Sequence, residues 1–200
     1  MPDYREIYNN VFSTDERYHL AQNSPGLRAT IQATDRLSML SGRSLDIGCG
    51  VGFVLEYLSG PSFRFNAFGV DVSDQAIEKS KSRMNHIPGA IQRIQRLASE
   101  ELPFEDRWFS LITCFDVLEH LDEPDIDRLL AEVKRTLHSQ GMFFCSVSCR
   151  TSGVLDINGE NLHRTVKSTD WWLERIKPEW AEYDGIRKQL SMWMRLPSLD

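Results

Sequence analysis

Long hydrophobic runs are absent from the 200-residue sequence. No uninterrupted apolar stretch approaches the roughly 18 residues that a membrane-spanning helix needs. The first residues are charged and lack the basic and then apolar pattern of a secretory leader. We therefore expect a cytoplasmic protein with no membrane partner.

Cysteine is scarce, and the few cysteines form no CxxC pair and have no histidine nearby at zinc-finger spacing. Such a pattern predicts reduced thiols instead of a disulfide framework or a zinc site. The cysteines are Cys49, Cys114, Cys145 and Cys149.

Basic residues are fewer than acidic ones. The sequence has 23 Lys and Arg and 29 Asp and Glu, which gives a formal net charge of −6. Nucleic-acid binding is driven by clustered Lys and Arg, so this balance argues against a nucleic-acid partner. An acidic chain of this kind is expected to meet a small-molecule acceptor or another protein, as a monomer or homodimer.

The composition, with 41% apolar and 26% charged side chains, amounts to about one ordinary globular domain. This composition excludes disorder, collagen and coiled coil, and the sequence has no internal repeat, low-complexity tract or Gly/Ser linker. We expect one domain over residues 1–200. It would have a helical N-terminal cap (1–40), a cofactor-binding core (41–148) and a substrate-side segment with antiparallel edge strands (149–200).

From residue 44 onward, short apolar runs alternate with amphipathic helices, which is typical of βαβ units. We expect an α/β fold with a doubly wound, mostly parallel, Rossmann-like sheet. Ser73 and Pro124 are placed to begin helices, and Gly141 to end one. The expected strands are 45–47, 65–70, a weak one at 91–97, 108–114, 142–148 and, around the turn signal at 184–185, the pair 180–183 and 190–196.

The first strand-to-helix turn contains Gly48, Gly50 and Gly52, which allow a tight turn and a close approach to a ligand. Asp71 ends the next strand, where its carboxylate can accept both hydroxyl groups of a ribose. Phe53 replaces the third glycine of a dinucleotide fingerprint, which disfavours a pyrophosphate. Asp46 would repel phosphates and suit a cationic ligand such as S-adenosylmethionine.

Four ordered motifs resemble the class I S-adenosylmethionine-dependent methyltransferases, and most closely their small-molecule branch. The resemblance covers about residues 44–148 and implies a seven-strand sheet whose last strand is antiparallel. The motifs are Leu45-Asp46-Ile47-Gly48-Cys49-Gly50, Gly69-Val70-Asp71-Val72-Ser73, Leu102-Pro103-Phe104 and Asp116-Val117-Leu118-Glu119-His120-Leu121.

The resemblance also implies the contacts of the cofactor. The glycine turn would border the methionine part of the cofactor, and Asp71 at the end of the second strand would border its ribose. The end of the fourth strand would face the methionine part and the donated methyl group. Ala98 stands where the family often has an acid for the adenine, so Ser99 or backbone must serve there. The implied cofactor residues are Asp46, Gly48, Cys49, Gly50, Asp71, Val72, Ser99, Glu100, Cys114 and Phe115.

His120 and His163 are the candidate catalytic residues, and His163 could take a proton from a substrate hydroxyl or amine. A structural role for Glu119-His120 and a solvated His163 are the competing interpretations. Asp116, Glu119, His120 and His163 could also hold a hard metal ion, but we expect no metal at this place. Weaker candidates for substrate contact are Tyr18, His19, Trp171, Trp172, Trp180 and Trp193. Tryptophans at such spacing more often belong to the core or to a dimer interface.

The sequence therefore predicts transfer of the methyl group of S-adenosylmethionine to an O or N atom of a small molecule, with S-adenosylhomocysteine as the product. Two alternatives remain open. One is a non-catalytic S-adenosylmethionine-binding or regulatory module, and the other is a nicotinamide-dependent oxidoreductase, which Phe53 disfavours.

Overall fold

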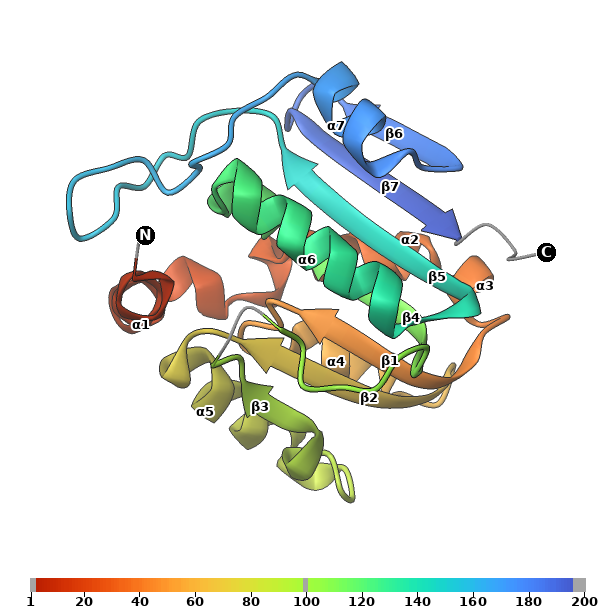
Figure 1. Ribbon diagram of the computed structural model, residues 1–200. Coiled ribbons are helices and arrows are strands. Elements are labelled where there is room, and N and C mark those ends of the chain that lie inside the picture. The colour runs from red at the N-terminus through yellow and green to blue at the C-terminus, as the bar shows by residue number, and fades with distance from the viewer. Residues whose placement is uncertain (1–2, 99–100, 196–200) are drawn as a thin grey trace. The chain divides into compact units, whose positions relative to one another are not determined.

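The computed structural model describes residues 3–98 and 101–195. The chain divides into two compact units, Met1–Ala98 and Ser99–Asp200. Each unit contains strands with helices packed against them, as Figure 1 shows. Among the described residues, no helix is both long and apolar enough to cross a bilayer.

The first unit begins with helices and continues as parallel βα units. Its strands pair in parallel in the order β3-β2-β1, and α4 and α5 pack against them (Figure 1). The helices are α1 (Tyr4–Thr14), α2 (Pro25–Gln32), α3 (Thr34–Leu37), α4 (Phe53–Leu58) and α5 (Asp74–Arg83), and the strands are β1 (Ser41–Ile47), β2 (Arg64–Asp71) and β3 (Ile94–Arg96).

Local signals set the helix starts of this unit. The Ser73 hydroxyl accepts a hydrogen bond from the Ala76 N–H and caps α5 as predicted. Ser24 and Pro25, where a chain break was expected, begin α2, with Ser24 as its N-cap. The weak strand expected at 91–97 is shorter, because residues 91–93 form a 3₁₀ turn before β3.

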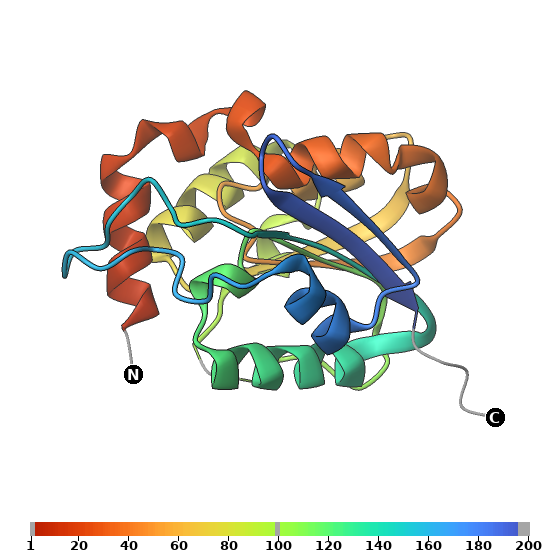
Figure 2. The same ribbon diagram turned by 90° about the horizontal axis from the view of Figure 1, so that it is seen from above.

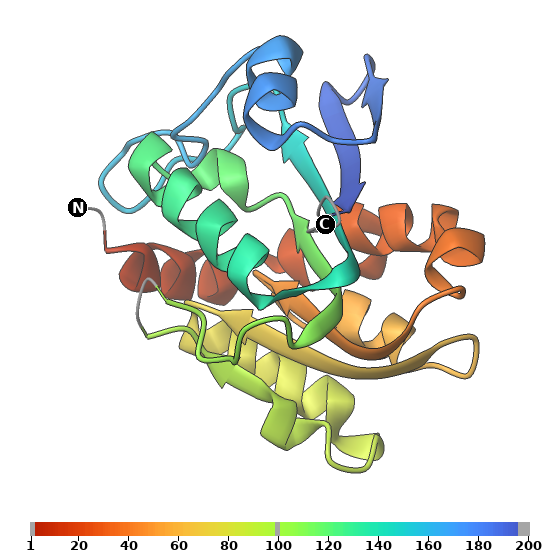
Figure 3. The same cartoon turned by 45° about the vertical axis from the view of Figure 1, so that its right-hand side comes forward.

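The second unit has the strand order β4-β5-β7-β6, with β5 antiparallel to β7 and β7 antiparallel to β6. Figure 3 shows the terminal hairpin with α7 beside it. The antiparallel pair expected around Asp184 is thus confirmed. The elements are β4 (Phe109–Phe115), the 3₁₀ turn η5 (Leu118–His120), α6 (Glu123–Thr136), β5 (Leu137–Ser148), α7 (Thr169–Ile176), β6 (Trp180–Asp184) and β7 (Gln189–Arg195).

The prediction that Gly141 ends a helix is wrong, because α6 ends at Thr136 and Gly141 lies inside β5. The β4–β5 register shifts between Phe109 and Leu111, and at this irregularity the two backbones approach closely. A Cβ on Gly141 would lie 3.0 Å from the Phe109 carbonyl oxygen and 2.9 Å from that of His138. Gly141 is therefore required by strand packing instead of helix termination.

Each unit has its own buried apolar core. In the first, Leu45, Leu55 and Leu58 are fully buried, and in the second Phe109 and Phe143 are. All four cysteines are free, as predicted, and three of them are buried. The α/β class and the parallel core predicted from the apolar runs are confirmed.

Candidate functional site

The glycine turn after β1 has the left-handed backbone that its residues suggest. The φ angles of Gly48, Gly50 and Gly52 are +70°, +52° and +88°, which residues with a Cβ rarely adopt. The N–H groups of Gly48 and Cys49 donate to the Val70 carbonyl at 2.9 and 3.0 Å, so β2 holds the start of the turn.

Asp71, at the end of β2, fixes the rest of the turn. Its Oδ2 accepts a 2.9 Å hydrogen bond from the Gly50 N–H, and its Oδ1 accepts one of 2.9 Å from the Ser73 N–H. Burial raises the pKa of Asp71 to about 6, although the N–H groups of Ser73 and Gly50 oppose the rise. The Val72 N–H opposes the rise as well, and the four lone pairs of the carboxylate still leave room for a ribose hydroxyl group.

Two other predicted cofactor residues in this unit have buried side chains. Asp46 lies in β1 and is 3% exposed. Cys49 packs inward on β2, where its Sγ would lie 3.0 Å from a Cβ on Gly69. Burial raises the pKa of the Cys49 thiol well above its usual value, and the charges of Asp71 and Asp46 raise it further. Any cofactor contact of Cys49 is therefore through its backbone, whereas Val72 is half-buried.

Gly52 serves helix packing as well as turning. A Cβ there would lie 2.6 Å from the Ser80 hydroxyl oxygen of α5. The glycine thus lets the start of α4 approach α5, and the free N–H groups at this end of α4 border the turn.

Helix α1 lies alongside α5, as Figure 2 shows. The Asn9 side-chain oxygen accepts hydrogen bonds from the Ser73 hydroxyl at 2.9 Å and the Gln75 N–H at 3.3 Å. Phe12 packs on Val51 of the glycine turn. The N-terminal cap predicted from sequence therefore borders the residues that follow Asp71.

Of the weaker N-terminal candidates, Tyr18 packs edge-on against Phe12, with ring centroids 5.6 Å apart. His19 Nε2 lies 2.7 Å from Lys79 Nζ, which also donates to the Phe12 carbonyl at 2.7 Å. Both side chains thus join α1 to α5, which favours a role in positioning the cap.

In the second unit, Arg135 of α6 holds the Leu-Pro-Phe motif. Its guanidinium group donates to the carbonyls of Leu102 and Phe104 at 2.9 and 2.8 Å. Glu132 accepts from the Leu102 N–H at 2.8 Å and from Arg135 at 2.7 Å. Sequence reasoning missed this clamp, because the Glu132 and Arg135 spacing predicts only a pair within the helix.

The end of β4 carries three residues of interest. Cys114 is fully buried, and Phe115 packs edge-on against Phe144 with ring centroids 5.0 Å apart. Asp116 has a left-handed φ of +53° and accepts hydrogen bonds from the Ser146 hydroxyl at 2.9 Å and the Gln189 amide at 2.6 Å. Asp is among the few residues with a Cβ that adopt this conformation readily.

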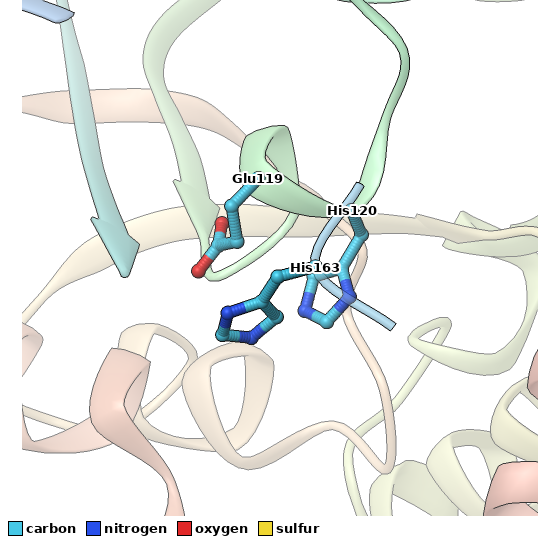
Figure 4. Close-up of side chains that lie close together, drawn as sticks. All are labelled: Glu119, His120 and His163. Carbon is cyan, nitrogen blue, oxygen red and sulfur yellow. The ribbon is translucent and has the colours of Figure 1, made fainter. Parts of the chain in front are cut away.

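Glu119, His120 and His163 form a cluster in which one possible ligand atom of each side chain lies within 4.8 Å of the others. Figure 4 shows the carboxyl group and the two imidazole rings gathered together. The two rings meet edge to face with centroids 4.7 Å apart. The structure thus brings both predicted catalytic histidines to one place, and it places Asp116 outside this group of three.

The protonation of both imidazoles follows from their partners. His120 Nδ1 lies 3.0 Å from the Leu162 carbonyl and His163 Nδ1 lies 2.5 Å from the Arg150 carbonyl. A carbonyl can only accept, so each Nδ1 carries hydrogen and each Nε2 carries the lone pair. Burial lowers the pKa of His120 to about 3, with help from His163, and burial also lowers the pKa of His163.

Glu119 is fully buried at the centre of this cluster. Its Oε1 accepts a 2.7 Å hydrogen bond from the Ser148 N–H, while its Oε2 has no hydrogen-bond partner among the described residues. Burial raises the pKa of Glu119 well above its usual value, and the charge of Asp116 raises it further. Ser148 was missed from sequence, because an apolar strand end gives no sign that its N–H meets a carboxylate.

The remaining predicted residues are two cofactor candidates and four tryptophans. Ser99 and Glu100 lie outside the described residues. Trp172 is fully buried, and the cations of Lys167 and Arg175 lie over the Trp171 ring, 5.3 and 4.5 Å from its centroid. Trp180 and Trp193 face each other across the β6–β7 hairpin.

The family follows from comparison with known proteins. Residues 45–145 match the family described as "Methyltransferase domain", and the chain belongs to that family. The chain is 31% identical over 194 residues to a mitochondrial ubiquinone biosynthesis O-methyltransferase of Candida albicans, covering 92% of this chain and 58% of that one. The chain thus spans little more than half the length of this curated relative.

Two solved structures share the fold. One is PH0226 protein from Pyrococcus horikoshii OT3, with a TM-score of 0.72, 20% identity and coverage of 94% of this chain and 99% of that one. The other is phosphoethanolamine N-methyltransferase 2 of Haemonchus contortus in complex with S-adenosyl-L-methionine, with a TM-score of 0.70, 20% identity and coverage of 92% and 45%. The seven-strand, Rossmann-like methyltransferase fold predicted from the motifs is confirmed.

Proposed function

We propose that the chain is an S-adenosylmethionine-dependent methyltransferase that methylates an O or N atom of a small molecule and leaves S-adenosylhomocysteine. The observation that carries the proposal is the hydrogen bond from the Gly50 N–H to Asp71. It joins a glycine turn to a buried carboxylate, as expected where a ribose is to be held beside a close backbone approach.

The predicted cofactor residues keep their proposed roles. The turn of Gly48, Cys49 and Gly50 would border the methionine part, Asp71 the ribose and Val72 the adenine. Asp46 would favour the cationic end of the cofactor. Cys114 and Phe115 would face the methyl group, and Ser99 and Glu100 would flank the adenine. The Candida albicans relative and the Haemonchus contortus complex support this choice of cofactor.

The bound cofactor would supply a methyl group already activated on a sulfonium. The protein then has to align the acceptor atom with the methyl carbon and remove a proton from it. His163 is the better base of the two histidines, because it is half-buried whereas His120 is buried and resists protonation. His120 would orient the acceptor.

We further propose that residues 1–200 act as one methyltransferase domain, since the family match runs through the boundary between the two units. A cytoplasmic location, a monomeric or homodimeric state and the absence of a nucleic-acid partner remain predictions. A non-catalytic binding module remains the alternative, because the residues of the glycine turn serve binding and not turnover.

A turnover assay tests the proposal. The chain is incubated with S-adenosylmethionine carrying a deuterated methyl group and a panel of phenols, alcohols and amines. We expect a product heavier by the labelled methyl group and an equal amount of S-adenosylhomocysteine. Cofactor binding without a labelled product from any acceptor would favour the binding module.

A further inference from the structure

Asn9 of α1 spans the start of α5 with three hydrogen bonds, all within the first unit. Its side-chain oxygen accepts from the Ser73 hydroxyl at 2.9 Å and from the Gln75 N–H at 3.3 Å. Its side-chain nitrogen donates to the Asp74 carboxylate at 3.3 Å. A backbone N–H can only donate and an ionised carboxylate can only accept, so these partners fix the orientation of the Asn9 amide. One side chain of α1 therefore holds three consecutive residues, 73–75.

Ser73 is also one of the two residues that hold Asp71. Its N–H donates to Asp71 Oδ1, and the Gly50 N–H donates to Oδ2, each at 2.9 Å. The Ser73 hydroxyl, which donates to Asn9, accepts from the Ala76 N–H at 3.2 Å. The position of Ser73 is thus set from two sides, by α5 and by α1.

Phe12, one helical turn after Asn9, reaches the other residue that donates to Asp71. Positions three apart in sequence lie on the same face of a helix. The Phe12 ring lies 3.5 Å from the position that a Cβ on Gly50 would take, and it packs on Val51. Helix α1 therefore contacts both residues whose N–H groups donate to the Asp71 carboxylate.

We infer that Asn9 is a positioning residue for the cofactor, because it holds residues 71–75 in the geometry in which Asp71 meets the ribose. The inference rests on the proposed function, in which Asp71 contacts the ribose of S-adenosylmethionine. A site whose groups are fixed before the ligand arrives loses less free energy to ordering when it binds. Asn9 acts through Ser73 and the start of α5.

Charged contacts lie at the same place and are expected to contribute less. Arg5 Nε donates to one oxygen of Asp74 at 2.8 Å, and Arg96 Nε lies 3.3 Å from the other oxygen. These side chains are partly exposed, and ion pairs of that kind are weak and are screened by salt. The effect of Asn9, which is uncharged, should therefore persist at high salt.

Cofactor affinity and turnover of the full chain test the role of Asn9. The wild type and Asn9→Ala are titrated with S-adenosylhomocysteine by calorimetry, and alanine favours helix, so the change does not weaken α1 itself. We expect the affinity to fall by about threefold to tenfold, the range of a neutral hydrogen bond. The KM for S-adenosylmethionine should rise, whereas kcat at saturating cofactor should stay unchanged.

The pH dependence of the affinity separates positioning from a loss of stability. Burial raises the pKa of Asp71 to about 6, and the Ser73 N–H opposes the rise. A looser bond from Ser73 would let the pKa of Asp71 rise further. The pH at which S-adenosylhomocysteine binding is half-maximal should therefore be higher in Asn9→Ala. Lower stability alone would leave this midpoint in place.

Asn10→Ala is the matched control, since Asn10 is the next residue of α1 and is exposed. We expect it to keep the wild-type affinity and midpoint. The double variant Asn9→Asp with Asp74→Asn exchanges the amide and the carboxylate, so it keeps a hydrogen bond between the two positions. It should recover most of the affinity that Asn9→Ala loses.

The wild-type affinity and midpoint in folded Asn9→Ala would overturn the inference. An equal fall in Asn10→Ala, or no recovery in the exchanged pair, would also overturn it. Failure of the wild type itself to bind S-adenosylhomocysteine would overturn the proposed function and this inference with it, so the two failures are distinguished.

Discussion

The imidazole rings of His120 and His163 meet edge to face, with centroids 4.7 Å apart and planes at 89°. One ring belongs to the turn after β4 and the other to the polar segment after β5, so the contact forms only when that segment folds back. Each ring donates from Nδ1 to a backbone carbonyl, which fixes its tautomer. The second unit thereby presents two neutral imidazoles at one place.

His163→Ala should lower kcat for methyl transfer by about 10²–10⁴, the usual contribution of a positioned base or acid. Cofactor affinity should stay unchanged, because the cofactor residues of the first unit are intact. Steady-state kinetics and S-adenosylhomocysteine titration on the same preparation measure both.

His138→Ala is the control for that variant, because His138 is exposed at the start of β5. Its kcat should equal that of the wild type. If His163→Ala also kept the wild-type kcat with every accepted substrate, His163 would have no part in the reaction.

The affinity for S-adenosylhomocysteine should depend on the ionisation of Asp71. The ribose hydroxyl groups donate to the carboxylate, so they favour its charged form. Because the pKa of Asp71 is about 6, affinity should rise as the pH increases from 5 to 7.5 and level off above the pKa. Calorimetry across this pH range measures it.

Asp71→Asn should weaken the binding by about tenfold or more, since charged hydrogen bonds contribute roughly 1.5–3 kcal/mol each, and should flatten the pH profile. Asp35→Asn, at an exposed position in α3, should change neither. An unaltered affinity in folded Asp71→Asn would remove the ribose assignment.

Gly52→Ala should destabilise the protein by about 2 kcal/mol or more, because it places a Cβ at a left-handed φ and near the Ser80 hydroxyl. Urea unfolding measures the change in the free energy of unfolding. Gly153→Ala is the control, since no atom lies within 4 Å of its Cβ position. Equal stability of the two variants would show that the turn tolerates a side chain.

Arg135→Lys should lower the free energy of unfolding by about 2 kcal/mol, because a lysine cannot reach both carbonyls of the Leu-Pro-Phe motif and the Glu132 carboxylate together. Arg128→Lys is the control, because Arg128 forms a partly exposed ion pair with Asp125 on the same helix. This variant should lower the free energy of unfolding by less than about 1 kcal/mol. Similar losses in both variants would argue against a special role for the clamp.

Features that depend on a few neighbouring residues could be predicted from the sequence. Ser73 caps α5 because a hydroxyl three residues before a free N–H needs no tertiary partner. The hairpin around Asp184 followed from its turn residues, and the glycine turn with Asp71 from the spacing of two strands. Gly141 was misread because its requirement comes from the His138 carbonyl of its own strand and the Phe109 carbonyl of β4, which approach it only in the folded sheet.

The candidate site was predicted in part for the same reason. Glu119 and His120 are adjacent in a recognisable motif, so they stood out together. Their meeting with His163 depends on the segment 150–168, which contains turns, an isolated bridge between Leu155 and Asn161 and no periodic pattern. The unsatisfied Glu119 oxygen is likewise visible only once burial and the Ser148 contact are known.

Calorimetric titration of the purified chain with S-adenosylmethionine, S-adenosylhomocysteine and NADH tests the cofactor assignment most directly. We expect micromolar or tighter binding of the first two at one site per chain and no heat from NADH. Failure of a folded sample to bind either sulfur compound, or preferential binding of NADH, would contradict an S-adenosylmethionine-dependent methyltransferase.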